Sequence, residues 1–254
     1  MRKRGDWLYC TVHPSSQIAR EKAEKDEARR PLQGRVRPRK GKLHARTKHG
    51  GEAKDHGAVA VVGGSAAGFY TAGLLARAGR AVRVLERAEE LSPAARTLIV
   101  TNRMREMLGA AGEQSVVNEI RRFELFTDGR AATVALAKPD LIIERAKLIR
   151  GLAEQAQAAG AKVELGRKFL KLEPNGHGLI LAVERSGDGA QEELRADTVV
   201  GADGAVSRVA QAAGWPRQET VPLVQAVVRL PAEYPAKTVR VWFVPEDTPY
   251  FYWL

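Results

Sequence analysis

Residues 58–68 read Ala-Val-Ala-Val-Val-Gly-Gly-Ser-Ala-Ala-Gly, and this stretch decides the fold. The small apolar residues at its start predict a short buried strand. The glycines after them predict a tight turn into a helix over residues 69–78, which Gly79 ends. Residues 81–86, Ala-Val-Arg-Val-Leu-Glu, then predict a second strand that finishes on an acidic side chain. The sequence therefore predicts a β-α-β unit within an α/β domain.

The spacing of the glycines predicts a dinucleotide site. Gly63 permits the tight turn, and Gly68 lets the helix lie close to the strand. Glu86, at the end of the second strand, is placed to accept hydrogen bonds from ribose hydroxyls. Ser65 departs from the G-x-G-x-x-G pattern, which has glycine at that position. It does not form a nucleophile elbow either, because Gly-x-Ser-x-Gly requires glycine where this chain has Ala67.

Charge separates the first 56 residues from the rest of the chain. They carry sixteen Lys and Arg against seven Asp and Glu, whereas the remaining residues carry 25 against 23. This composition predicts a disordered basic leader over residues 1–56. A basic arm for nucleic acid or anionic lipid, a metal site at its histidines (His44, His49, His56), and an extension without function all stay open. We expect no nucleic-acid binding on the near-neutral folded part.

Cysteine content and hydropathy indicate the compartment. The one cysteine, Cys10, cannot form an internal disulfide, which favours a reducing environment. No apolar run reaches the length of a membrane span. Residues 7–12 are too short and too polar at their flanks for a signal peptide. We therefore expect a cytoplasmic protein without a transmembrane span.

After the β-α-β unit the pattern predicts a mixture of helices and strands. The predicted helices are residues 101–112, 113–121 and 142–159. The predicted strands are residues 122–126, 130–136, 162–165, 168–172, 179–184 and 198–201. Beyond residue 220 only strands are predicted, over 223–230, 238–244 and 249–254. Since no turn or cap follows the last of them, we expect the chain to be incomplete relative to the fold it begins.

A second motif follows another predicted parallel strand. Residues 199–208 read Val-Val-Gly-Ala-Asp-Gly-Ala-Val-Ser-Arg, with Asp203 and Gly204 just past the strand end. An acidic residue there suits an anchor for sugar hydroxyls. Together with the first unit, this motif resembles the flavoprotein hydroxylase and geranylgeranyl reductase superfamily of FAD-dependent enzymes. The resemblance covers about residues 57–254, including Ile-Glu-Arg at 143–145 and the closing Pro-Tyr-Phe-Tyr-Trp-Leu.

The resemblance implies a fold, a cofactor and a set of site residues. The fold is α/β, with a Rossmann-like FAD-binding domain over 57–219 and the first strands of a substrate-binding β-sheet over 220–254. FAD is the implied cofactor, NAD(P)H a possible reductant, and a small apolar or aromatic molecule the substrate. The implied cofactor-binding residues are Gly63, Ser65, Ala67, Gly68, Glu86, Arg87, Arg103, Asp203 and Gly204. Arg103 and Arg145 can equally be solvated helix residues.

The chain also departs from this family in two places. The Cys-Gly-Gly-type loop of many geranylgeranyl reductases is absent between residues 92 and 103. The second Gly-Asp motif, which in the family follows the substrate sheet and holds the flavin, is expected to lie beyond residue 254.

Three functions stay open on the sequence. The first is an FAD-dependent oxidoreductase, of monooxygenase or prenyl-reductase type, which uses flavin for hydride transfer. The second is a non-catalytic, truncated remnant of such an enzyme. The third is an NAD(P)-binding dehydrogenase, which accounts for Glu86 but leaves the Asp203-Gly204 motif unexplained. No catalytic residue is assigned, because no Ser-His-Asp set, metal cluster or carboxylate pair stands out.

Overall fold

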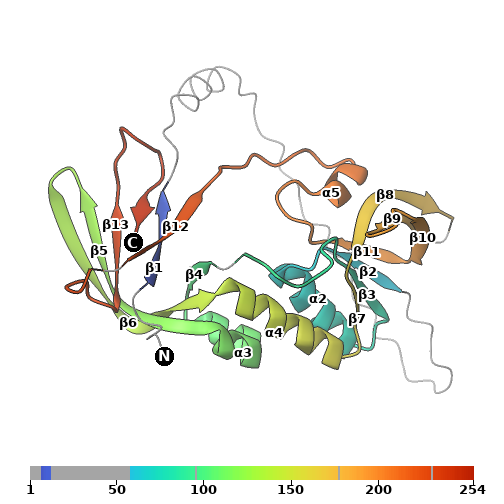
Figure 1. Ribbon diagram of the computed structural model, residues 1–254, viewed down its shortest axis with the longest axis horizontal. Coiled ribbons are helices and arrows are strands. Elements are labelled where there is room, and N and C mark those ends of the chain that lie inside the picture. The colour runs from blue at the N-terminus through green and yellow to red at the C-terminus, as the bar shows by residue number, and fades with distance from the viewer. Residues whose placement is uncertain (1–6, 13–57, 95, 177, 230) are drawn as a thin grey trace, which may run out of the picture.

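The predicted β-α-β unit lies in the middle of a four-stranded parallel sheet (Figure 1). The computed structural model describes residues 7–12, 58–94, 96–176, 178–229 and 231–254. The strand order is β11-β2-β3-β7, and every neighbouring pair is parallel. Their bounds are β2 Val59–Val62, β3 Val82–Leu85, β7 Lys162–Glu164 and β11 Thr198–Gly201. The carboxyl ends of β2 and β11 therefore lie side by side, which brings the two glycine motifs together.

Both faces of this sheet are covered, which explains the almost continuous apolar run of β2. Helices α2 (Ala66–Arg77) and α4 (Arg145–Ala158) cover one face, where Val59 and Val61 are buried against them. A three-stranded antiparallel sheet covers the other face and packs on Ala60 and Val62. Its strands are β8 Arg167–Asn175, β9 Gly178–Arg185 and β10 Gln191–Ala196. The short helix α5 (Arg208–Ala212) adds Val209 to this second core.

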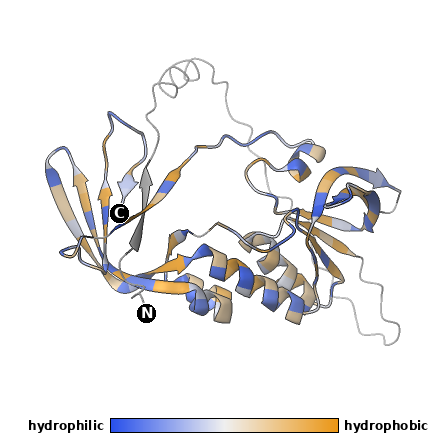
Figure 2. Cartoon of the chain, viewed as in Figure 1, coloured by the Kyte–Doolittle hydropathy of each residue, from blue (hydrophilic) through white to orange (hydrophobic). Residues whose placement is uncertain are grey.

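Helix α4 links the parallel sheet to the rest of the molecule. Figure 2 shows it striped in hydrophilic and hydrophobic colours, as expected for a helix that buries one face. Its buried face includes Ile149, Leu152 and Ala156. Helix α3 (Arg103–Ser115) packs on the same helix, and both contribute buried residues to one core.

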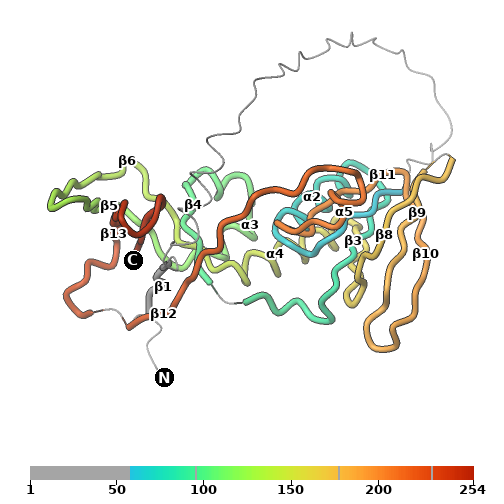
Figure 3. Tube along the Cα trace, turned by 90° about the horizontal axis from the view of Figure 1, so that it is seen from above, coloured from blue at the N-terminus to red at the C-terminus, as the bar shows by residue number. Residues whose placement is uncertain are grey.

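A seven-stranded sheet lies at the other end of the molecule (Figure 3). Its order is β12-β1-β14-β13-β5-β6-β4. The bounds are β1 Trp7–Val12, β4 Thr97–Val100, β5 Val116–Thr127, β6 Arg130–Glu144, β12 Val224–Arg229, β13 Thr238–Trp242 and β14 Tyr252–Trp253. All its pairs are antiparallel except β13 with β5. Strands β4, β5 and β6 belong to this sheet, so it also contains residues well before residue 220, where the predicted substrate-binding sheet begins.

The structure differs from the predicted disordered leader in one place. The backbone of residues 7–12 forms β1, which pairs with β12 from Trp7↔Arg229 to Val12↔Val224. Trp-Leu-Tyr-Cys-Thr-Val is a run of strand-forming residues, which the average composition of a charged segment conceals. Residues 1–6 and 13–57, including all four leader histidines, lie outside the described residues.

Two predicted helices differ from the observed elements. The helix predicted over residues 113–121 is wrong, because β5 begins at Val116 and its β-branched and aromatic residues pair with β6. The helix predicted from residue 142 begins only at Arg145, since Ile142 and Ile143 pair with β4 at the end of β6. Strand β4, over residues 97–100, lies just before the helix predicted from residue 101, in a stretch for which we predicted no element.

Two absences hold for the described part of the chain. No helix there is long and apolar enough to cross a membrane. The same residues contain no group of three or more His, Cys, Asp or Glu arranged to hold a metal ion.

Candidate functional site

The glycine turn is held so tightly that two of its positions exclude any side chain. Gly63 has φ +108°, and a Cβ atom there would lie 2.4 Å from the carbonyl oxygen of Ala202. A Cβ atom at Gly68 would lie 2.0 Å from the carbonyl oxygen of Gly63. Real Cβ atoms do not come this close to backbone. The turn after β2 therefore needs glycine at both positions, as the spacing predicts.

Ser65 has a defined place in this turn. It is the N-cap of α2, and its Oγ accepts a hydrogen bond from the Gly68 backbone N–H at 3.2 Å. The same hydroxyl donates to the carbonyl oxygen of Ala202 at 3.1 Å. Serine instead of glycine thus ties the first motif to the second. The N–H groups of Ala66 and Ala67, in the first turn of α2, have no intrahelical acceptor and suit an anion.

Glu86 lies against the glycine turn. Its Oε2 accepts from the Gly64 N–H at 2.5 Å, and its Oε1 accepts from the Ala88 N–H at 2.8 Å. Each carboxylate oxygen can accept more than one hydrogen bond, so this contact leaves acceptor capacity for sugar hydroxyls. The predicted ribose contact of Glu86 stays a prediction.

Asp203 closes the second loop. Its Oδ1 accepts from Ser207 Oγ at 2.5 Å, and its Oδ2 accepts from the N–H groups of Arg208 and Val209 at 2.7 and 3.2 Å. Gly204 follows with φ +90° and turns the backbone towards α5. The carboxylate thus shapes the loop, and its predicted contact with sugar hydroxyls stays a prediction.

A cleft of about 340 Å³ opens where the two motifs meet. Five of the predicted site residues line it: Gly63, Ser65, Arg87, Asp203 and Gly204. Ala67, Gly68, Glu86 and Arg103 do not line it. The structure thus brings both glycine motifs and Arg87 to one cleft, whereas Arg103 lies outside it at the start of α3.

The cleft is strongly positive. Five basic side chains line it, against the single carboxylate of Asp203: Arg87, Arg145, Arg167, Lys168 and Arg208. Lys168 pairs with Glu184 at 2.8 Å, and Arg167 Nη1 lies 3.0 Å from Glu192. The other three have no carboxylate of a described residue within 4.0 Å. Unpaired guanidinium groups beside a helix N-terminus suit a pyrophosphate.

Arg145 occupies a position that is costly for a cation. Burial, and then the like charge of Arg96, lower the pKa of its guanidinium. The residue begins α4, where Glu144 caps the helix by accepting from the N–H groups of Ala146 and Lys147 at 3.0 and 3.2 Å. A bound anion would relieve the repulsion between Arg96 and Arg145. The residues present therefore fit the diphosphate part of FAD.

Part of this cleft has no signal in the sequence. Arg167, Lys168 and Phe169 reach it from β8, which comes from a different sheet. Nothing in their local pattern distinguishes them from other strand residues, because their role depends on sheet packing. Arg208 is the last residue of the second motif, and this position is the one sequence signal from which its place in the cleft could have been predicted.

A second, larger cleft of about 830 Å³ lies on the seven-stranded sheet. Aliphatic and aromatic side chains dominate its lining, among them Leu98, Ile99, Phe123, Leu125, Leu223, Val227, Val239, Val241, Phe243, Phe251 and Trp253. The two edge strands of the sheet, β4 and β12, both contribute to it. Gln225 Nε2 donates to the Thr97 carbonyl oxygen at 3.3 Å, so the sheet curls until its edges meet around the cleft.

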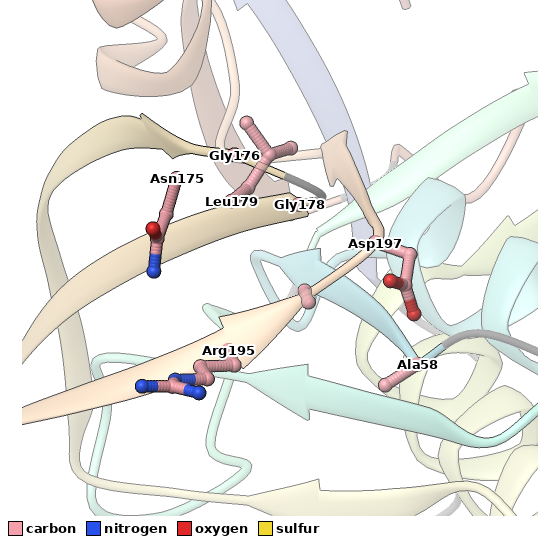
Figure 4. A pocket seen from close by; sticks show the side chains of 8 residues that line it. Ala58, Asn175, Gly176, Gly178, Leu179, Arg195 and Asp197 are labelled. Carbon is pink, nitrogen blue, oxygen red and sulfur yellow. The ribbon is translucent and has the colours of Figure 1, made fainter.

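A third cleft, of about 380 Å³, lies at the amino ends of β2 and β11 (Figure 4). Asn175, Arg195 and Asp197 contribute its polar side chains. In Figure 4 the Arg195 side chain points away from Asp197, so the charged groups do not converge. The glycine turn lies at the opposite ends of the strands. This cleft is therefore separate from the candidate site.

Comparison with known proteins agrees with this geometry. A family model described as FAD binding domain matches residues 56–244. A protein named digeranylgeranylglycerophospholipid reductase 2, from Methanopyrus kandleri, is 31% identical over 169 residues, which are 61% of this chain and 39% of that protein.

Solved structures of proteins in complex with FAD are also similar to this chain. Aklavinone-11 hydroxylase, in a ternary complex with FAD and aklavinone, is 25% identical with a TM-score of 0.51, over 64% of this chain and 36% of that one. The flavin-dependent monooxygenase PieE, in complex with FAD and substrate, superposes with a TM-score of 0.55 over 62% of this chain and 32% of that one. At 22% identity, PieE supports the fold alone.

This chain spans less than half of the length of each of these three proteins. The family model nevertheless covers most of the chain, and it includes both glycine motifs and the basic cleft between them. The predicted α/β fold with a Rossmann-like parallel sheet is confirmed. The chain belongs to the FAD-binding domain family.

Proposed function

We propose that the protein is an FAD-dependent oxidoreductase of the monooxygenase or reductase type. The observation that carries this proposal is the basic cleft, where the glycine turn, the start of α2 and three arginines that pair with no carboxylate of the described residues meet. FAD, when bound, supplies the hydride-transfer and electron-transfer chemistry. The protein's part is to bind and orient this group and to position the substrate.

Each element of the cleft has a task in this proposal. The first N–H groups of α2 and the guanidinium groups of Arg87, Arg145 and Arg208 hold the diphosphate. Glu86 accepts from the ribose hydroxyls, and the loop that Asp203 closes faces the ribityl chain. Arg103 lies outside the cleft, and we propose no contact for it.

The apolar cleft is the proposed substrate site. Its size and its aromatic lining suit a small apolar or aromatic molecule. The names of the relatives support such a substrate, because one contains aklavinone and another is a reductase of a geranylgeranyl lipid. NAD(P)H is the proposed reductant. A cytoplasmic location stays a prediction that rests on the single cysteine.

Titration with FAD tests the proposal directly. We expect the purified chain to quench flavin fluorescence at a one-to-one ratio, and Gly68→Ala to abolish this binding because its Cβ atom overlaps the Gly63 carbonyl oxygen. Gly73→Ala in the same helix is the matched control. Its Cβ atom would meet Ala156 at an ordinary 3.5 Å, so FAD affinity should be retained.

Two further measurements separate the alternatives. Arg145→Met and Arg208→Gln remove charge without changing the turn, and each should weaken FAD binding by about tenfold if it loses one charge-assisted hydrogen bond. Tight binding of NAD⁺ with no binding of FAD would instead favour a dehydrogenase. Binding of neither cofactor by a folded chain would overturn the proposed function.

A further inference from the structure

The part of the apolar cleft that β12 forms is held by little side-chain packing. β12 is the edge strand of the seven-stranded sheet, and its one strand neighbour among the described residues is β1 (Figure 1). Leu223 and Val227 line the cleft, yet they are 66% and 48% exposed. Every residue from 211 to 224 is exposed as well. Burial therefore does not fix the position of this wall.

Backbone pairing with β1 is what fixes β12. The two strands pair in antiparallel register over their full lengths, from Trp7↔Arg229 to Val12↔Val224. β12 is also joined to the opposite edge of the sheet, but only by the Gln225 side chain, through the hydrogen bond of 3.3 Å to β4 described above. That distance lies beyond the usual range for an N–H to oxygen bond, so the ladder with β1 is the stronger attachment.

β1 also contacts the strand on its other side. Thr11 pairs with Trp253 of β14, and Trp253 lines the cleft. β1 therefore lies between two strands that both contribute to the cleft lining, although it comes first in the chain and they lie after residue 220. Without β1, β12 would have no backbone partner and would be separated from β14 by two strand spacings, about 10 Å.

We propose that β1 is a docked strand that completes the apolar cleft, and that substrate binding depends on its being in place. The N-terminal segment then occupies a slot between β12 and β14 in the way that an extended peptide adds a strand to a sheet. The inference rests on the proposed function, since it concerns the substrate cleft, and it adds a means of regulation. Withdrawal of β1 would release β12 and remove one wall of the cleft.

The chain's single cysteine provides the first test. Cys10 lies opposite Ala226 in the ladder, and opposed residues of antiparallel strands have Cα atoms about 4.5–5.5 Å apart, which a disulfide can span. Under mild oxidation, Ala226→Cys should form a bridge to Cys10 within one chain, detected by peptide mass spectrometry and non-reducing electrophoresis. Val227→Cys is the matched control, because successive side chains of β12 point to opposite faces, and it should not bridge. No bridge in Ala226→Cys, or a bridge between two chains, would overturn the inference.

Two prolines within β1 test the consequence for the cleft. Because the N–H groups of successive strand residues point to opposite neighbours, Leu8→Pro/Tyr9→Pro must remove one hydrogen bond to β12. We expect the backbone amides of β12 to exchange faster with deuterium. The uncharged fluorescent probe N-phenyl-1-naphthylamine should bind at least about tenfold more weakly, as the loss of contact with Leu223 and Val227 predicts.

Two controls make this result specific. Lys3→Pro/Arg4→Pro places the same prolines before β1 and should change neither amide exchange nor probe binding. A synthetic peptide of residues 5–14 should restore both properties to the Leu8→Pro/Tyr9→Pro variant. It has to be added at up to about 1 mM, because a covalently linked segment docks at an effective concentration of that order. The peptide with the two prolines should restore neither property, and failure of the parent peptide would overturn the inference.

The remaining outcomes separate this inference from the proposed function. The Leu8→Pro/Tyr9→Pro variant should keep the FAD affinity of the parent, because the basic cleft belongs to the other end of the molecule. Loss of FAD binding in this variant would mean that β1 supports the whole fold, and the inference would be wrong. Unchanged exchange of β12, unchanged probe affinity, or a parent that binds no probe would refute the role of β1 and leave FAD binding intact. If the parent binds no FAD, the proposed function fails, and the cysteine bridge and the probe titrations still decide the inference.

Discussion

Replacing Ser65 tests how the two motifs hold each other. Ser65→Ala removes a helix N-cap, which typically costs about 1 kcal/mol. It also removes the donor to the Ala202 carbonyl oxygen, a hydrogen bond whose net contribution is about 0.5–1.5 kcal/mol. Since the backbone of Ser65 is extended, at φ −93° and ψ 173°, alanine fits without strain. We therefore expect the free energy of unfolding to fall by about 1.5–2.5 kcal/mol.

Ser65→Gly separates the two contributions. Glycine is a tolerable N-cap and costs only a few tenths of a kcal/mol there, so this variant should lose mainly the bond to Ala202. It should be more stable than the alanine variant by roughly 0.5–1 kcal/mol. The glycine variant also restores the G-x-G-x-x-G pattern, and its FAD affinity should stay close to that of the parent.

Urea unfolding followed by far-UV circular dichroism is the assay, and Ser92→Ala is the control. The Ser92 hydroxyl makes no hydrogen bond to another described residue, so its loss should change stability by less than about 0.5 kcal/mol. If Ser65→Ala unfolds at the same urea concentration as the parent, the hydroxyl does not couple the two loops. The argument that serine replaces the pattern's glycine for a structural reason would then be refuted.

Three other perturbations follow from the geometry. Asp203→Ala leaves the donors of its loop unpaired, so it should lower the free energy of unfolding by about 1–3 kcal/mol and weaken FAD binding. Equal FAD occupancy in the variant and the parent would show that Asp203 is not part of the site. Deleting residues 1–12 removes β1 from its place beside β12 and should lower the melting temperature; an unchanged transition would mean that β1 contributes no packing energy. The hydrogen bond from Arg83 lowers the pKa of the Glu164 carboxyl. Their pair therefore stabilises the fold fully when the pH is above the ordinary pKa of that carboxyl, and this stabilisation is lost as the pH falls through the lowered pKa. Arg83→Met should therefore be less stable than the parent at neutral pH and nearly equal to it in acid, and a pH-independent difference in urea midpoint would contradict the linkage.

The first β-α-β unit could be predicted almost residue by residue, because its signals are local. The strand, the turn and the helix of residues 58–78 each follow from their own composition. The glycines are required by contacts within the same unit or with the next motif, so spacing alone identifies them. The same holds for the turn at Asp128-Gly129, where Asp128 adopts a positive φ of 42° between two strands.

Other parts depend on partners that lie far away in the sequence. β5 begins at Val116 because β6 pairs with it, and the helix-like pattern of residues 113–121 cannot reveal this. The basic lining from β8 reaches the cleft only because a second sheet covers the parallel one. The apolar cleft forms because β4 and β12, distant in the chain, meet at Gln225 and Thr97. A single sequence carries no local signal for such pairings.

The junction of β6 and α4 links the two halves of the candidate site. Before the junction, Leu141 and Ile143 are buried and pair with β4, which fixes one wall of the apolar cleft. At the junction, the Glu144 carboxylate caps α4. After it, Arg145 enters the basic cleft and its N–H holds the Arg96 carbonyl oxygen. Because strand, cap and arginine are consecutive residues, the position of the apolar cleft relative to the basic cleft is set by backbone geometry. A substrate bound along the sheet would then be held at a fixed position relative to a cofactor bound at the glycine turn, which is the positioning that the proposed oxidoreductase requires.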